Sequence, residues 1–382
     1  MKTIEWPKWP QYGPEEQAAV ARVIKSNQLF ADREVKSFER QYASYIGCNY
    51  ALGLGNGTQG LHLALAALNI GIGDEVIVSP YSWISSSSCV LMQNAVPIFC
   101  DIERDSLGLC PNEIEKNITH RTKAIIIVHM FGYPAKINEI VALSEKYGIP
   151  LIEDASHTHG SSVEEKKIGN FGLISVFSLH QRKALSVGDG GIVCTNNKKI
   201  YDKIYKLRSF GHEELSYNYR MTEFAGALGK VGLSKLDTFN SQKIENAFIL
   251  QKLFDNNDHL KVRISRENEI GVYYAVLFEV TKNVVKLDLK ISRLNKKGIP
   301  LIKTWKPLHK HPHFNPKFIP ARGLPWKEND YTGKMKNMKY KDIKLTNTDY
   351  YCPSRILQLE VHPPVDKNLI ELAAIEIKNE IN

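Results

Sequence analysis

The spacing of apolar side chains predicts an alternation of helices and strands over the first two thirds of the chain. A helix is expected to begin at Pro14, because proline suits a first helical turn and glutamates follow it. Leu61, Ala64, Leu65 and Leu68 repeat at helical spacing further on. Short apolar runs predict strands at 76–78, 96–100, 123–128, 150–153, 175–178 and 191–195. This order predicts an α/β domain with a mostly parallel sheet and a ligand site beyond the carboxyl ends of its strands.

The pattern changes around Asp237. We expect one helix over 221–236, a second over 240–253, a strand over 271–280 and a last helix from Asp366 onward. A chain of 382 residues is long for one domain. We therefore predict a large domain over 1–240, with an N-terminal arm, and a smaller C-terminal α/β domain over 241–382.

Composition narrows the class of protein. The formal net charge is +9, but basic residues are dispersed and the one dense run, 334–344, is short, which argues against a nucleic-acid partner and allows anionic ligands. No apolar run is long enough to span a membrane, and the first residues lack the apolar core of a secretory signal. The six scattered cysteines indicate reduced thiols and a cytoplasmic location, with neither disulfides nor a zinc site.

One lysine occupies a restrained position. Residues 177–183 read Phe-Ser-Leu-His-Gln-Arg-Lys, residues 188–191 read Gly-Asp-Gly-Gly, and a predicted strand lies on either side. A short loop between two strands restrains Lys183 more than a helix surface would, as an amine that attacks a carbonyl requires.

A glycine-rich turn over 51–58 leads into the predicted helix of Leu61. Free backbone N–H groups at such a helix start attract an anion, so the turn is a candidate phosphate cradle, although a plain helix start is the alternative. Thr58 stands where a dinucleotide fingerprint needs glycine, which disfavours a nucleotide-binding oxidoreductase.

Together these segments resemble the DegT/DnrJ/EryC1/StrS aminotransferases over about residues 15–364. The resemblance implies the fold-type-I architecture and pyridoxal phosphate as cofactor. It implies that Lys183 forms the Schiff base and moves protons, and that Asp154 pairs with the pyridine nitrogen. His157 is implied to contact the ring hydroxyl, and Trp83 to stack on the ring.

The resemblance also assigns the phosphate site to Gly57, Thr58, Gln59 and Ser178. Asn218 matches the asparagine that reaches the phosphate of the neighbouring subunit, so a homodimer with a shared active site is expected. His309, in a Pro-Leu-His loop, is given a substrate role; its spacing to the next histidines fits no zinc pattern. Taken singly, each residue has a structural alternative: a helix cap for Asp154, core packing for His157 and Trp83, and a turn for Asn218.

The function implied is transfer of an amino group from L-glutamate or L-glutamine to the ketone of a sugar or polyol. A nucleotide-linked or phosphorylated acceptor in surface-glycan or amino-sugar biosynthesis fits the family and the charge. The Trp-Pro-Lys-Trp-Pro segment at 6–10 resembles the branch acting on keto-cyclitols, so a keto-cyclitol or a small keto-polyol phosphate stays open. Dehydration is disfavoured because such relatives carry histidine in place of Lys183. A non-catalytic regulator should lack one of the cofactor residues, and none is missing.

Overall fold

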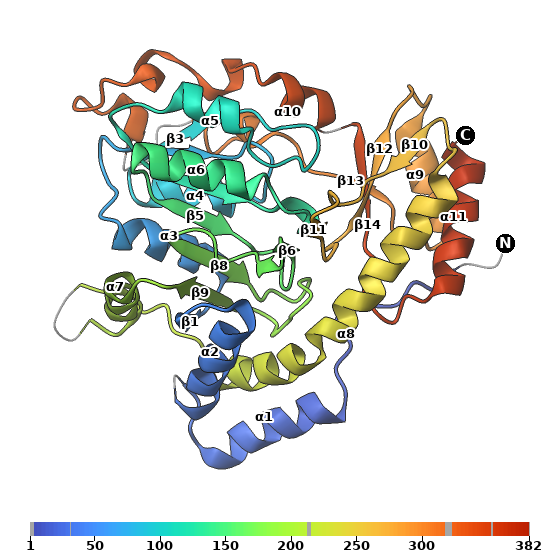
Figure 1. Ribbon diagram of the computed structural model, residues 1–382, viewed down its shortest axis with the longest axis horizontal. Helices are drawn as coiled ribbons and strands as arrows, with labels where there is room; N and C mark the ends of the chain where they lie inside the picture. Colours follow the sequence, from blue (N-terminus) through green and yellow to red (C-terminus); the bar gives the residue numbers. More distant parts are fainter. Residues whose placement is uncertain (1–3, 31, 212–214, 318–322, 353, 382) are drawn as a thin grey trace.

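The fold is built on a seven-stranded sheet in the order β1-β9-β8-β5-β4-β2-β3 (Figure 1). The computed structural model describes the chain except residues 1–3, 31, 212–214, 318–322, 353 and 382. The strands are β1 (Tyr50–Leu54), β2 (Glu75–Val78), β3 (Val96–Phe99), β4 (Thr122–Val128), β5 (Leu151–Asp154), β8 (Ile174–Ser178) and β9 (Gly191–Thr195). From β8 to β3 all pairings are parallel, whereas β9 runs against both its neighbours. The predicted α/β class with a mostly parallel sheet is confirmed.

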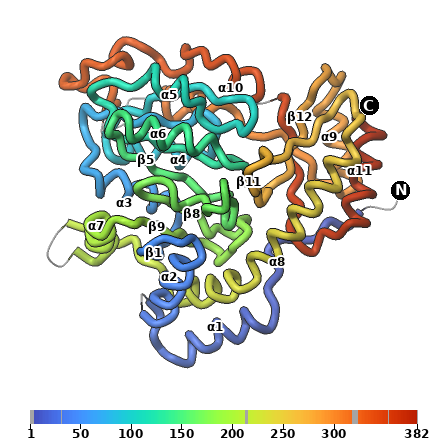
Figure 2. The backbone as a smooth tube through the Cα atoms, in the orientation of Figure 1, coloured from blue at the N-terminus to red at the C-terminus, as the bar shows by residue number. Residues whose placement is uncertain are grey.

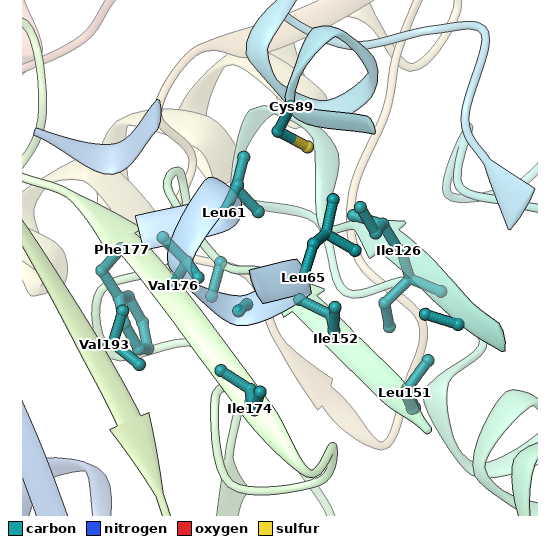
Figure 3. Close-up of a cluster of buried hydrophobic side chains, with 14 of the residues drawn as sticks. Leu61, Leu65, Cys89, Ile126, Leu151, Ile152, Ile174, Val176, Phe177 and Val193 are labelled. Atoms are coloured by element: carbon teal, nitrogen blue, oxygen red, sulfur yellow. The ribbon is translucent and has the colours of Figure 1, made fainter. Parts of the chain in front are cut away.

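Helices pack against this sheet through apolar faces. The helices before β10 are α1 (Pro14–Ser26), α2 (Arg33–Ile46), α3 (Gly57–Ala67), α4 (Ser85–Met92), α5 (Pro111–Asn117), α6 (Ile137–Tyr147), α7 (Lys198–Arg208) and α8 (Glu223–Phe254). Leu61 and Leu65 of α3, Cys89 of α4, and Val176 and Ile152 of the sheet belong to one buried cluster (Figure 3). Burying such side chains stabilises the fold by about 2 kcal/mol each, and it fixes the start of α3 beside the ends of β5 and β8.

A second, antiparallel sheet has the order β10-β12-β14-β13 and contacts α8 through β10. Its strands are β10 (Leu260–Val262), β12 (Val276–Val280), β13 (Ile302–Lys303) and β14 (Ile356–Leu359), with helices α9 (Leu287–Lys296), α10 (Thr346–Tyr351) and α11 (Lys367–Ile381) nearby in sequence. A small sheet of β6 (Ser162–Val163), β7 (Lys166–Lys167) and β11 (Glu269–Ile270) lies between the two larger ones (Figure 1). Short 3-10 helices span Met130–Gly132, Leu308–Lys310, Pro325–Lys327, Lys334–Asn337 and Tyr340–Asp342.

Part of the C-terminal third returns to the first sheet. The Tyr340 hydroxyl donates to the Pro97 carbonyl at 2.7 Å, and Tyr331 donates to Glu75 at 2.7 Å. The predicted boundary after residue 240 falls inside α8, and the assignment of all of 241–382 to one domain stays a prediction.

Two expected elements differ from the structure. Residues 221–236 and 240–253 belong to one unbroken helix, α8. Polar residues near the predicted break bond to other segments: Tyr45 donates to Asp237 at 2.6 Å, and Asn240 donates to the His159 carbonyl at 2.7 Å. The strand predicted over 271–280 begins only at Val276, because Tyr273 has a φ of 44°, which interrupts extended backbone.

Within the described part of the chain, no helix combines the length and the apolar character needed to cross a bilayer. The same residues contain no group of three histidine, cysteine, aspartate or glutamate side chains arranged to hold a metal ion.

Candidate active site

A cavity of about 560 Å³ opens where β5 and β8 end and α3 begins. This is the carboxyl edge of the parallel strands, where ligands of such sheets bind. Its lining includes Asn56, Gly57, Thr58, Ser82, Trp83, Ser85, Asp154, Ser156, His157, Ser178, His180, Arg182, Lys183, Asp189, Tyr274 and Trp305.

Lys183 lies on the predicted loop between β8 and β9. The loop is closed by hydrogen bonds from the Leu179 N–H to the Gly190 carbonyl at 2.8 Å and from the Val187 N–H to the Leu179 carbonyl at 3.0 Å. The Lys183 amine lies 4.8 Å from the ring centroid of Tyr274. Burial lowers the pKa of this amine to about 8, although the carboxylates of Asp154 and Glu360 oppose the shift. At pH 7 about a tenth of the amine is therefore unprotonated and nucleophilic, far more than for an ordinary lysine.

Asp154 ends β5 and faces the same cavity. Its Oδ2 accepts a hydrogen bond from the Ser86 hydroxyl at 2.6 Å, and its Oδ1 accepts from the Ser156 N–H at 3.3 Å. The Ser86 hydroxyl also lies 2.6 Å from that of Ser82. This chain of hydrogen bonds holds Ser86 in place and so fixes the rotamer of the Asp154 carboxylate. A carboxylate oriented in this way can hold a proton on a nitrogen heterocycle placed in the cavity.

The start of α3 forms the opposite end of the cavity. Asn56 caps the helix by accepting from the Gln59 N–H at 2.9 Å, and the Thr58 hydroxyl lies 2.7 Å from that of Ser85. A Cβ on Gly57 would lie 3.1 Å from the Cβ of Ser178, and one on Gly191 would lie 2.4 Å from the Asn56 carbonyl carbon. The two glycines therefore let the helix start approach β8 and β9, leaving hydroxyls and a helix N-terminus for an anion.

Aromatic rings form the remaining walls. Trp83 is 58% exposed, and its ring meets that of Trp305 at 5.8 Å. His157 stacks on Tyr274 at 4.3 Å, and its Nδ1 accepts from the Phe131 N–H at 3.2 Å. Burial, and then the nearby Lys183 amine, hold the pKa of His157 well below its usual range, so the ring is neutral and its Nε2 carries the proton.

The structure gathers most of the predicted site residues in this cavity: Gly57, Thr58, Trp83, Asp154, His157, Ser178 and Lys183. Gln59, Asn218 and His309 do not line it. Gln59 folds back toward Gly55, and Asn218 lies before α8 with a φ of 59°. His309 is fully buried beside Phe99, 3.7 Å from the Asp349 carboxylate, so its position gives the predicted substrate role no support.

Sequence reasoning missed the residues that reach the cavity from distant segments. Tyr274 and Trp305 come from the C-terminal third, and no local pattern marks either of them. Ser86 could have been noticed, since a run of four serines at 85–88 opens α4 two residues after Trp83.

These residues fit pyridoxal phosphate. The cavity has hydroxyls and a helix start for the phosphate, an oriented carboxylate for the ring nitrogen, an indole for the ring face and an amine of lowered pKa. A cavity of this volume suits a cofactor together with a small substrate.

Comparison with known proteins decides the family. The family model described as the DegT/DnrJ/EryC1/StrS aminotransferase family matches residues 10–356. The chain belongs to this family. It is an aminotransferase, and its cofactor is pyridoxal phosphate, as the resemblance implied.

Relatives of this aminotransferase include the GDP-perosamine synthase of Escherichia coli O157:H7, 34% identical over 77% of this chain and 83% of that protein. The L-glutamine:2-deoxy-scyllo-inosose aminotransferase of Streptomyces fradiae is 34% identical over 66% of each chain. Among solved structures, 3-amino-5-hydroxybenzoic acid synthase superposes with a TM-score of 0.87 and 26% identity, covering 100% of this chain and 99% of the other.

Proposed function

We propose that this aminotransferase moves an amino group from L-glutamate or L-glutamine to the ketone of a sugar or polyol, with Lys183 as the Schiff-base residue. The observation that carries the proposal is that the Lys183 amine, the Asp154 carboxylate and the Thr58 hydroxyl line one cavity at the edge of the sheet. The relatives that act on a nucleotide-linked sugar or on a deoxy-inosose support the acceptor class.

The chain's own residues supply binding and proton handling. Asp154 would hold a proton on the ring nitrogen of the cofactor, which makes the ring an electron sink. Trp83 would cover one ring face and exclude water there, while Thr58 and Ser178 would bind the phosphate. Lys183, when its amine is free, would carry a proton between the substrate carbon and the cofactor.

We further propose that the enzyme works in the cytoplasm as a homodimer. Asn218 lies outside this chain's cavity, as expected if it serves the phosphate of the neighbouring subunit. A protein that stays monomeric at working concentration, by sizing with light scattering, would remove this role.

Lys183→Ala tests the proposal. The variant should lose the yellow colour of the purified enzyme and at least about 10³-fold in turnover, because it lacks the nucleophile and the proton carrier. Lys198→Ala, on the exposed ion pair of α7, is the matched control and should keep both. Wild-type turnover by the Lys183→Ala protein would overturn the assignment.

The acceptor is identified by a screen with glutamate or glutamine as donor. Nucleoside-diphosphate keto-sugars are expected to react, with keto-inositols and small keto-phosphates as the competing classes. The screen is scored by appearance of the keto acid. If only keto-inositols react, the nucleotide-linked acceptor is wrong and the keto-cyclitol alternative holds.

A further inference from the structure

The N-terminal arm, residues 4–13, contacts the loop that carries Lys183. The indole N–H of Trp9 donates to the backbone carbonyl of Lys183 at 2.9 Å. Three residues on, the Tyr12 hydroxyl lies 3.0 Å from the Ser186 hydroxyl and 3.3 Å from the Ser186 carbonyl. The arm and the loop are thus joined at two places with the same spacing in each segment.

The start of the arm is anchored beside α9 and the second sheet. The Ile4 N–H donates to the Lys297 carbonyl at 2.8 Å, just after α9, and Trp6 packs against the core of the second sheet. From there the arm crosses α8, where Trp9 contacts Phe239, and reaches α1 (Figure 2). Its ordered course therefore spans from the second sheet to the lysine loop.

Trp9 sits at the junction of these parts. Its ring stacks on His362 at 4.8 Å with an interplanar angle of 12°, and it meets the edge of Phe239 of α8 at 5.4 Å. His362 follows β14 and is 4% exposed. Burial, with Lys243 and Lys183 nearby, holds the pKa of His362 well below its usual range, so this is a stack of neutral rings. Such a stack fixes the plane of the indole and hence the direction of its N–H.

We propose that Trp9 is a positioning residue for Lys183: its indole ties the backbone of the lysine loop to the second sheet through the stack on His362. The proposal rests on the proposed function of Lys183, since the loop needs positioning only if that amine reacts. The bond acts on the main chain of residue 183, so it sets where the side chain starts without touching the cofactor or the substrate.

Trp9→Phe tests this, because phenylalanine keeps an aromatic ring for the stack and removes the N–H donor. Trp6→Phe is the matched control: it makes the same change in the same arm, away from the loop. The first measurement is amide hydrogen exchange of residues 179–188 in the cofactor-free protein. One ordinary hydrogen bond is worth about fivefold in an equilibrium, so Trp9→Phe should raise exchange there about fivefold. Trp6→Phe should leave it unchanged.

The second measurement is steady-state kinetics on the loaded enzyme. Trp9→Phe should lower kcat about fivefold with KM for donor and acceptor unchanged, since substrate contacts are intact. Tyr12→Phe, at a ring that is 48% exposed, removes the neighbouring contact and should raise exchange over the same loop. Exchange and kcat equal to those of Trp6→Phe would overturn the proposal. Failure of the proposed function would be seen separately, as turnover that survives Lys183→Ala.

Discussion

The end of β5 places two carboxylates side by side on opposite faces of the sheet, and their surroundings differ. Glu153 is fully buried and accepts from Phe171, Gly172 and Gly169 N–H groups at 2.6 to 2.8 Å and pairs with His129 at 3.2 Å. Asp154 is 5% exposed, accepts from Ser86 and Ser156, and turns toward the cavity. Because successive strand residues face opposite ways, one strand end supplies both.

The difference separates a carboxylate whose hydrogen-bonding capacity is filled by the protein from one that can still bind a ligand. Both oxygens of Glu153 are occupied, so it fastens the 169–172 turn and has no capacity for a ligand. Burial alone would raise the pKa of Glu153, but the His129 bond and the backbone donors bring it below its usual value. Each Asp154 oxygen accepts a single hydrogen bond, whereas each Glu153 oxygen has two partners, so Asp154 keeps accepting capacity toward space that a cofactor ring can fill. Burial of an acidic group therefore does not by itself show whether the group can bind a ligand. Glu153 and Asp154 differ in how many of their lone pairs the protein leaves free, and in where those lone pairs point.

Asp154→Asn tests the carboxylate that faces the cavity. Asparagine keeps the shape and the bond to Ser86 but cannot hold a proton on a ring nitrogen, so kcat should fall by about 10²- to 10³-fold. Stability, by urea titration, should change little. Activity within threefold of wild type would show that Asp154 is only a cap for the turn at 155–158.

Glu153→Gln tests the carboxylate on the opposite face of the sheet. The amide NH₂ would meet backbone donors and the pair with His129 would be lost, which should cost about 3 kcal/mol of unfolding free energy. Activity per folded molecule should be retained. The wild-type contribution is present above the ordinary glutamate pKa of 4.5 and disappears as the pH falls through the lower folded value, so the deficit should shrink in acid. An unchanged urea midpoint would contradict this account.

The titration of the Lys183 amine, on the cavity side of the sheet, should give a smaller effect. The amine attacks an aldehyde only when neutral, and its pKa is about 8 against an ordinary 10.5. The rate at which the cofactor-free enzyme takes up pyridoxal phosphate should therefore rise with pH around a midpoint near 8. Stopped-flow absorbance measures this. A midpoint above 10 would mean that the loop leaves the amine in water.

The parts of the site that sequence could predict are those built locally. Asp154 ends one short apolar strand, Lys183 lies on the loop that follows another, and strand ends of a parallel sheet meet at one edge. The glycine-rich start of α3 was equally visible, because its chemistry depends on neighbouring residues alone.

Other features depend on contacts between distant segments. Tyr274 and Trp305 reach the cavity from the C-terminal third, and Trp9 reaches Lys183 across 174 positions. The predicted break in α8 failed for the same reason. The apolar pattern changes around Asp237, but Asp237 and Asn240 stay within the helix and bond to Tyr45 and His159 of distant segments.

The continuity of α8 also limits how the molecule can open. With 32 residues it is about 48 Å long, and it packs on α1 and α2 near its start and on α11 and β10 further along. Because one helix packs on α1 and α2 and also on α11 and β10, a movement that widens the entrance for a bulky acceptor has to bend α8 or change its packing on one of these elements.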